Sequence, residues 1–341
     1  MDRTQKWMGS VGCLGQIENI KRQSLNMLLF LVPVLALSCK HEVVYDIDYS
    51  ISLDKSNTYE VGKPVRFNFS GEVDNIVFYS GETGHRYEFR NRYEVSREAV
   101  KEASLQIDYQ ARYGDPGAME VWISKEFAGL SGTDAAADKA TVKAMTEGNM
   151  AGWERLEYQE GASQKWTTQK YPLNEYMSSF AIAFHWNPKD NKKTQRSYWI
   201  NGGITLDLEG MKPSTINFSG LDFVTVMMND EIEDPYMKNN GNGSIILNKP
   251  STATLIFQGI GANALPYAID GWVISKATPL NKVANDKGVA IKNLQNYLHT
   301  FEYTWTEPGT YTVTFVGTNS NYAGASQDVK EMTITIFDSK E

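Results

Sequence analysis

The chain contains very little cysteine, with only Cys13 and Cys39 among 341 residues. It also lacks basic stretches longer than two residues, and its formal charge is −8, from 41 acidic and 33 basic residues. Proteins that bind nucleic acid through its phosphates need clustered Lys and Arg, so nucleic acid is not an expected partner. Helical periodicity is scarce as well. The composition, 41% hydrophobic and 12% aromatic, is that of a globular protein with two or three domains and excludes disorder, collagen and coiled coil.

Long hydrophobic runs are limited to residues 27–37, which are too short to span a bilayer because a helix needs about 20 apolar residues. Lys21-Arg22 precedes this run, and Ser38-Cys39 follows it. Basic residues, a short apolar core and a small residue at the cut describe a secretory signal peptide. Ala36-Leu37-Ser38-Cys39 resembles the lipobox of bacterial lipoproteins. We therefore predict a lipoprotein signal peptide over residues 1–38, with Cys39 as the lipidated first residue of the mature chain; a buried N-terminal helix is the alternative. A single remaining cysteine excludes an internal disulfide.

Downstream, short runs of alternating β-branched and aromatic residues are separated by Gly, Pro, Asn and Asp. This pattern predicts an all-β fold of the sandwich or jelly-roll kind. The clearest predicted strands are 65–69, 75–79, 104–109, 119–124, 180–186, 198–201, 223–227, 245–247, 253–257, 271–274, 301–305, 310–316 and 331–336. One segment, 134–145, is Ala-rich with an acidic start and later Lys, which favours a helix.

Several Gly and Pro residues indicate turns between these strands. Pro308-Gly309 suits a type II turn and predicts a hairpin from Trp305 to Tyr311. Gly81 and Gly84 are expected to allow turns with positive φ. The Asn/Gly-rich segment 238–244 is interpreted as an interdomain linker or a long sandwich loop, and 187–195 as an exposed loop tip.

Two segments resemble a known family. Residues 302–319, with Pro-Gly leading into Thr-Tyr-Thr-Val-Thr-Phe, resemble the closing half of a PKD-type immunoglobulin-like domain, and residues 61–84 resemble its opening half. With the lipoprotein signal, the chain resembles Bacteroidetes cell-surface lipoproteins of unassigned function that are commonly linked to glycan uptake. Those systems pair a TonB-dependent transporter with a SusD-like lipoprotein.

The resemblance implies a domain order and a location. It implies a tether and an N-terminal Ig/PKD-like segment over 39–95, a galactose-binding-like jelly roll over 96–235, and a C-terminal Ig/PKD-like domain over 236–341. It also implies an outer-membrane protein, held by its lipid anchor alone and exposed at the cell surface, with the periplasmic face as the alternative. The implied partners are a glycan and a neighbouring transporter or SusD-like lipoprotein.

Catalytic motifs are absent from the sequence. There is no His-Glu-x-x-His, Gly-x-Ser-x-Gly or Walker-type loop, and the four histidines are far apart. The acidic run Asp230–Asp234 departs from the carboxylate pattern of jelly-roll glycosidases, and Pro235 ends it, so we interpret it as a solvated loop. We predict no catalytic residue and no cofactor; a structural calcium bound by these carboxylates is the alternative.

Aromatic residues provide the remaining candidate chemistry, because sugars stack on exposed Trp and Tyr while neighbouring polar groups bind their hydroxyls. Trp122, Trp272 and Trp305 lie inside alternating strands and are predicted to be core. The predicted ligand-binding platform consists of Trp153, Trp166, Trp186, Asn187, Asp190, Gln195, Arg196, Tyr198 and Trp199. Tyr236 and Tyr267 form a second, weaker candidate.

These observations favour a non-catalytic cell-surface lipoprotein that binds oligo- or polysaccharide for an uptake system. Two other classes stay open at this stage. The sandwiches could instead serve adhesion or assembly by binding a protein partner, which an apolar edge would indicate. A glycoside hydrolase or lyase would require two carboxyl groups about 5 to 9 Å apart in a cleft.

Overall fold

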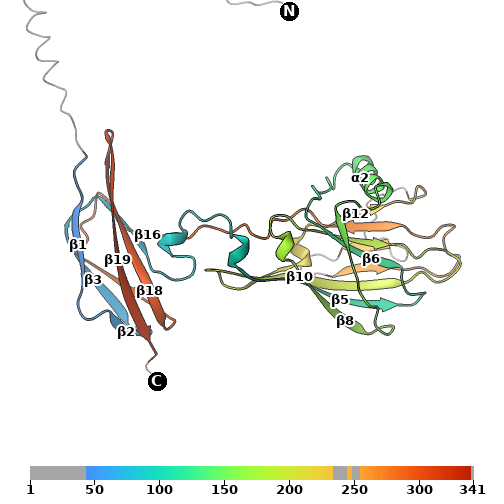
Figure 1. The fold of residues 1–341 in the computed structure, drawn as a ribbon, viewed down its shortest axis with the longest axis horizontal. Coiled ribbons are helices and arrows are strands. Elements are labelled where there is room, and N and C mark those ends of the chain that lie inside the picture. The colour runs from blue at the N-terminus through green and yellow to red at the C-terminus, as the bar shows by residue number, and fades with distance from the viewer. Residues whose placement is uncertain (1–43, 233–243, 248–253, 339–341) are drawn as a thin grey trace, which may run out of the picture.

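The computed structural model describes residues 44–232, 244–247 and 254–338. They form two β-sandwiches placed side by side, here called the terminal sandwich and the central sandwich (Figure 1). The predicted all-β class is confirmed. The predicted lipidation site Cys39 lies outside the described residues.

The terminal sandwich combines strands from both ends of the chain. Its smaller sheet has the order β1-β3-β17, and its larger sheet has the order β16-β4-β18-β19-β2. The strands are β1 (Asp48–Leu53), β2 (Thr58–Glu60), β3 (Pro64–Glu72), β4 (Asn75–Tyr79), β16 (Val289–Lys292), β17 (Thr300–Thr304), β18 (Gly309–Asn321) and β19 (Gly324–Phe337). Trp305, fully buried between the sheets, packs edge-on against Tyr303 with ring centroids 4.8 Å apart.

This arrangement differs from the two separate Ig-like units implied by the resemblance. Strand β17 pairs with β3, and β18 pairs with β4, so residues 48–79 and 289–337 share one core. The physical reason is that β1, β3 and β4 expose more apolar surface than so short a segment can cover alone. The expected boundaries at 95 and 235 do not coincide with the division that the sheets show.

The predicted hairpin at Pro308-Gly309 is wrong. Strands β17 and β18 lie in different sheets of the terminal sandwich, and Gly309 lacks the positive φ that a type II turn requires. The chain instead crosses between the sheets at 305–308. The long hairpin of this region is β18–β19, which pairs continuously from Gly309↔Ile336 to Asn321↔Gly324.

The central sandwich is built from residues between those two segments. One sheet, called the β5 sheet, has the order β13-β14-β10-β5-β8, with β11 paired to β10; the other, called the β9 sheet, has the order β12-β15-β9-β6-β7. The strands are β5 (Val100–Arg112), β6 (Met119–Ser124), β7 (Trp153–Leu156), β8 (Trp166–Pro172), β9 (Ala181–Trp186), β10 (Ser197–Leu208), β11 (Ser214–Asn217), β12 (Val224–Met227), β13 (Ser244–Leu247), β14 (Leu255–Gln258) and β15 (Gly271–Ile274).

Helix α2 (Ala135–Glu147) covers part of the outer face of the β9 sheet, as predicted for 134–145 (Figure 1). Asp134 caps it by accepting a hydrogen bond from the Ala137 amide at 3.0 Å, because the first amides of a helix lack partners. Val142 of the helix and Trp272 of β15 are both buried in the cluster of side chains between them. The outer face of the β5 sheet carries polar and aromatic side chains instead.

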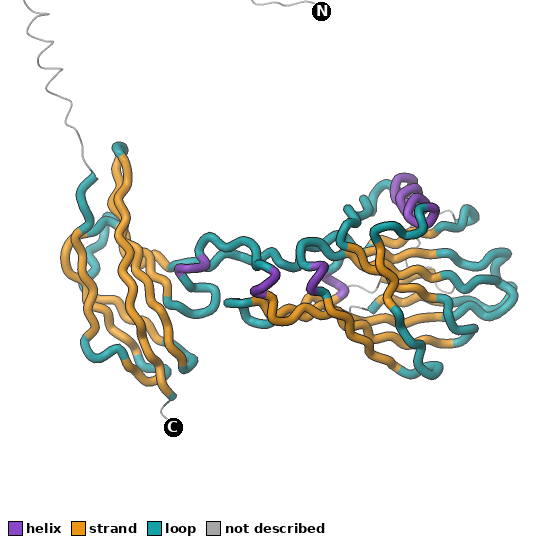
Figure 2. The backbone as a smooth tube through the Cα atoms, viewed as in Figure 1, coloured by secondary structure: helices purple, strands orange, loops and turns teal. Residues whose placement is uncertain are grey.

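Loops and short helical turns connect the sandwiches (Figure 2). The turns η1 (Tyr87–Phe89) and η2 (Arg97–Ala99) lie in the first connection, whose residues run beside the returning segment near 281–287. The Val95 amide donates to the Asn281 carbonyl at 2.9 Å, and the Val283 amide donates to the Tyr93 carbonyl at 3.1 Å. Gly81 and Gly84 have the predicted positive φ, +80° and +90°.

Candidate functional site

The outer face of the β5 sheet places two tryptophans in one row. Trp199 on β10 lies opposite Gln110 on β5, and Gln110 lies opposite Trp166 on β8. Residues directly opposite each other in a sheet project from the same face. The intervening strand separates the tryptophans by about 10 Å, given the spacing of neighbouring strands.

Both indole rings are accessible to different degrees. Trp166 is 50% exposed. Trp199 is half-buried because the Arg112 guanidinium lies over its ring, 4.0 Å from the centroid. Arg112 is held there by donating from Nε to Gln110 Oε1 at 2.6 Å. The Gln110 amide between the rings is 6% exposed, and its Nε2 donates to the Gln164 carbonyl at 2.8 Å, so it holds the row together rather than facing solvent. The row therefore offers two aromatic rings on one face, one of which lies under a guanidinium.

The next rows of this face are polar. Asp108 lies between Asn201 and Thr168, and its carboxylate accepts hydrogen bonds from Thr168 Oγ1 at 2.6 Å and from Gln106 Nε2 at 3.1 Å. The next row has Gln106 beside the exposed Lys170. We call this surface the polar face: Gln106, Asp108, Gln110, Arg112, Trp166, Thr168, Lys170, Trp199 and Asn201.

Two members of the predicted platform are core residues. Trp186 and Tyr198 are fully buried. The Trp186 indole Nε1 donates to the Arg196 carbonyl at 2.9 Å, and the Tyr198 hydroxyl donates to Glu160 Oε1 at 2.7 Å. Their rings are not available as a stacking surface, in contrast to the expectation from the sequence.

Arg196 and Gln195, also predicted for the platform, support the end of the central sandwich. Arg196 Nε lies 2.7 Å from Glu160 Oε2, and the two side chains are only 7% and 11% exposed. Arg196 Nη1 also donates to the carbonyls of Tyr113 and Gly114, at 2.8 and 2.9 Å. Gln195 is 2% exposed and bonds to the backbone of Tyr267 and Ile269. These contacts are structural.

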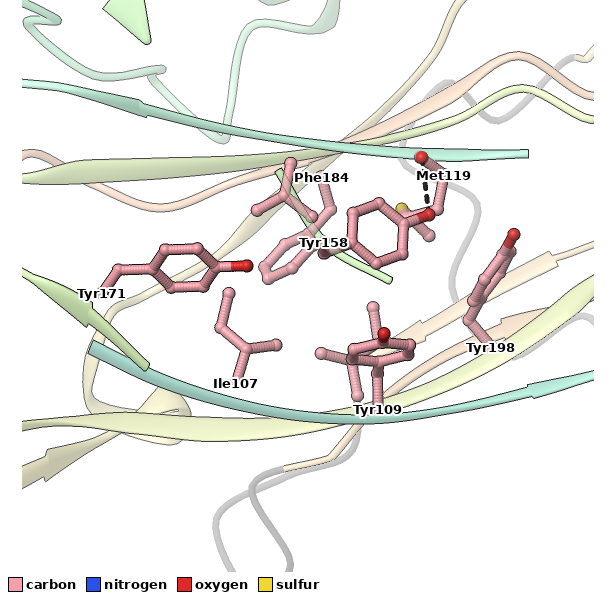
Figure 3. Close-up of a pocket in the computed structure, with 9 residues that line it drawn as sticks. Ile107, Tyr109, Met119, Tyr158, Tyr171, Phe184 and Tyr198 are labelled. Atoms are coloured by element: carbon pink, nitrogen blue, oxygen red, sulfur yellow. Dashed lines mark hydrogen bonds between the residues drawn. The ribbon is translucent and has the colours of Figure 1, made fainter. Parts of the chain in front are cut away.

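Four tyrosines surround a small internal cavity beside this ion pair (Figure 3). The cavity, of about 10 Å³, lies among Tyr109, Tyr158, Tyr171 and Tyr198, at the lower limit for one water molecule. The Tyr158 hydroxyl donates to the Met119 carbonyl at 2.7 Å. Burial raises the pKa of Tyr109 to about 12 and raises the pKa of Tyr158 and Tyr198 still further, with nearby Glu160 adding to each shift. The cavity belongs to the core and is too small for a sugar.

The remaining predicted residues lie elsewhere. Trp153 is half-buried on the outer face of the β9 sheet, where its ring packs 5.0 Å from that of Phe127. Asp190 is exposed in the loop between β9 and β10 and accepts from the Lys192 amide. Asn187 is half-buried and accepts from the Lys189 amide. Of the predicted set, only Trp166 and Trp199 lie together on one outer face.

The acidic run and the second aromatic candidate are described only in part. Asp230 is exposed and bonded to Lys139 Nζ at 2.8 Å, which lowers the pKa of its carboxyl group. Glu233, Asp234 and Tyr236 lie outside the described residues. Tyr267 is half-buried, and its carbonyl accepts from Gln195. Within the described part of the chain, no three His, Cys, Asp or Glu side chains are grouped to hold a metal ion, and no helix is long and apolar enough to cross a membrane.

Comparison with known families gives one match. A family model described as a domain of unknown function, DUF5017, matches residues 38–202. Over these residues the chain is similar to this family. No curated protein matches the chain. The DUF5017 segment runs through β1–β4 and into β10, so it includes parts of both sandwiches and all nine residues of the polar face.

A second polar cluster, on the outer face of the β9 sheet, was not predicted from the sequence. His185 on β9 lies flat on the buried Trp272 ring, 4.0 Å between centroids. Its Nε2 lies 2.8 Å from Asp270 and its Nδ1 lies 3.6 Å from Glu120. His185, Asp270 and Glu120 are distant in sequence and come together only through the pairing of β15, β9 and β6. No local sequence motif therefore predicts this cluster. The Trp272 ring, Asp270 and Glu120 already contact the imidazole of His185.

Proposed function

We propose that this protein is a non-catalytic, lipid-anchored surface protein that binds oligo- or polysaccharide on the polar face. The observation that carries the proposal is the row Trp199, Gln110, Trp166 on an outer sheet face. Aromatic rings stack against the apolar faces of sugars, while amide, carboxylate and guanidinium groups bind hydroxyls. This face supplies both kinds of group within neighbouring strands.

The spacing of the two rings points to the kind of glycan. Two rings about 10 Å apart on one sheet suit an extended chain that crosses β10, β5 and β8. These residues lie on the surface of a sheet and do not form a deep pocket for the end of a glycan chain. We therefore propose that an internal segment of a linear polysaccharide lies along the row, on its way to a neighbouring transporter complex at the outer membrane.

The surroundings of Asp108 support binding rather than hydrolysis. Glycosidases use two carboxyl groups on either side of the scissile bond. Asp108 has Asn201 and Thr168 opposite it, and Gln106 and Gln110 at the next positions on its own side of β5. Its carboxylate already accepts hydrogen bonds from Thr168 and Gln106. None of these neighbours of Asp108 is a second carboxyl group, which supports binding rather than hydrolysis.

Affinity electrophoresis of the mature protein through gels that contain plant and host polysaccharides tests the proposal, with and without a chelator. Retardation by one polysaccharide is expected, and Trp166→Ala or Trp199→Ala should each abolish most of it. Tyr93→Ala is the matched control, because Tyr93 is an aromatic residue of similar exposure, 61%, in the connection between the sandwiches. Unretarded migration in every gel, or equal retardation of all variants, would refute the polar face as the glycan site and favour a protein-binding role. Loss of retardation only with the chelator would point to calcium.

A further inference from the structure

The most exposed large apolar side chains of the described residues gather at one end of the terminal sandwich. They are Tyr297, Tyr45, Tyr322 and Leu294, which are 91%, 83%, 80% and 69% exposed. Scattered single apolar residues on a surface are ordinary, whereas a group of them indicates contact with something.

Three separate segments bring these side chains together. Tyr322 is at the turn of the β18–β19 hairpin, Leu294 and Tyr297 follow β16, and Tyr45 precedes β1. The Tyr45 carbonyl accepts hydrogen bonds from Asn319 Nδ2 and Ser326 Oγ, both at 3.2 Å, which fixes the entering chain to the hairpin. An open groove of about 1360 Å³, with Tyr45, Leu294, Tyr297 and Asn321 in its lining, lies at this end.

This end is also where the chain arrives from the proposed lipid anchor. Val44 is five residues after Cys39, and five residues span at most about 18 Å. The C-terminal residue of β19, Phe337, pairs with Glu60 at the opposite end of the sandwich, and Figure 1 shows the hairpin tip beside the entering chain, away from the C-terminus. An anchor at Cys39 therefore holds the end of the terminal sandwich that carries these four exposed side chains close to the membrane.

We propose that the end formed by Tyr45, Leu294, Tyr297 and Tyr322 rests on the bilayer surface with its side chains among the lipid headgroups. This inference depends on the proposed anchor at Cys39, but not on the polar face. Tyr favours membrane–water interfaces because its ring is apolar and its hydroxyl is polar. A tether of so few residues makes this contact effectively intramolecular, so weak individual contributions suffice.

The charge at this end selects the type of lipid. Asp46, Asp48, Glu72 and Asp74 line the same groove, against one cation, Lys292. Lys292 Nζ already donates to the Asp74 carbonyl at 3.1 Å. Carboxylates repel an anionic surface. The contact should therefore be stronger on zwitterionic than on anionic headgroups.

Fluorescent labelling of the lipidated protein tests this contact. Tyr297→Cys and Tyr322→Cys each introduce a labelling site, since Cys39 is blocked by its lipid and Cys13 is removed with the signal. The controls are Phe337→Cys at the opposite end and Tyr113→Cys in the central sandwich, at residues that are 46% and 56% exposed. An environment-sensitive dye is attached, and each protein is reconstituted into phosphatidylcholine vesicles with and without brominated lipid.

A blue-shifted emission that brominated lipid quenches is expected at 297 and 322 and not at 337 and 113, with a smaller shift in phosphatidylglycerol. Identical spectra at all four positions would overturn the inference. A role for this end in binding a protein partner would then be favoured instead. Labelling of the unsubstituted protein at Cys39 would show that the anchor is absent and would refute the inference for that reason. The glycan proposal would still stand or fall by its own gel assay.

Discussion

Replacing Glu160 by Gln is predicted to destabilise the central sandwich by about 3 kcal/mol, because it leaves the Arg196 charge buried without its counter-ion. Arg196 Nε and Glu160 Oε2 are 2.7 Å apart, and the side chains are 7% and 11% exposed. Breaking a buried pair from one side costs about 3 to 5 kcal/mol, and Arg does not escape the cost by losing its proton.

The contacts that survive place the value at the lower end of that range. Arg196 Nη1 keeps its hydrogen bonds to the carbonyls of Tyr113 and Gly114. The amide oxygen that remains after Glu160→Gln can still accept from the Tyr198 hydroxyl and the Gly117 amide, which now bond Glu160 Oε1 at 2.7 and 2.9 Å. Removing both charges in Glu160→Gln/Arg196→Met should restore part of the loss, since replacing a buried pair by apolar groups is often close to neutral.

Urea unfolding followed by near-ultraviolet circular dichroism gives the free energy of unfolding of each variant. The terminal sandwich, which none of these side chains contacts, serves as the internal control. A loss below about 1 kcal/mol for Glu160→Gln, or a double variant less stable than either single variant, would refute the reasoning.

Three further predictions follow from burial and backbone geometry. Trp186→Ala should cost about 3 to 5 kcal/mol because the fully buried indole leaves a cavity, whereas Trp166→Ala should stay within about 0.5 kcal/mol; equal losses in urea unfolding would contradict the assignment of one to the core and the other to the surface. The pKa of Tyr109 is raised to about 12, so near pH 10 the unfolded chain releases this proton while the folded chain keeps it. The stability that is present below pH 10 should therefore be lost as the pH rises toward 12. Phenolate absorbance of Tyr109 at pH 10 with the fold intact would argue against this prediction. Gly81→Ala should cost about 2 kcal/mol or more, because φ is +80° and a Cβ would lie 2.6 Å from the Thr312 carbonyl oxygen; an unchanged melting temperature would contradict this.

Local patterns predicted the strands well, because alternation and turn residues act over a few positions. The strands predicted at 75–79, 119–124 and 271–274 have the same bounds in the structure, and the helix at 134–145 lies within one or two residues of α2. Trp122, Trp272 and Trp305 were predicted to be core. Trp272 and Trp305 are buried, and Trp122 is half-buried against the side chains that pack between helix α2 and the β9 sheet.

Pairing of distant segments was beyond local patterns. Nothing near β3 in sequence indicates that β17, which lies close to the other end of the chain, pairs with it, nor that β18 completes the sheet of β4. The sequence resemblance suggested two Ig-like units because it recognised the two halves of one sandwich separately.

The candidate platform failed for a simpler reason. Successive side chains of a strand point to opposite faces, so Tyr198 and Trp199 on β10 cannot belong to one surface. The same alternation puts Trp186 in the core and His185 outside it. Applied strictly, it would have removed Tyr198 or Trp199 from the predicted set, although the meeting of Trp166 with Trp199 still depends on the register of β5 with both strands.

The most direct test of the polar face is a nuclear magnetic resonance titration of the indole N–H signals with the polysaccharide fragment that retards the protein. Binding at the polar face predicts that the signals of Trp166 and Trp199 shift together and saturably, while those of the buried Trp186, Trp272 and Trp305 stay in place. Shifts at Trp153 with Trp166 and Trp199 unchanged would place the glycan on the opposite sheet and contradict the account.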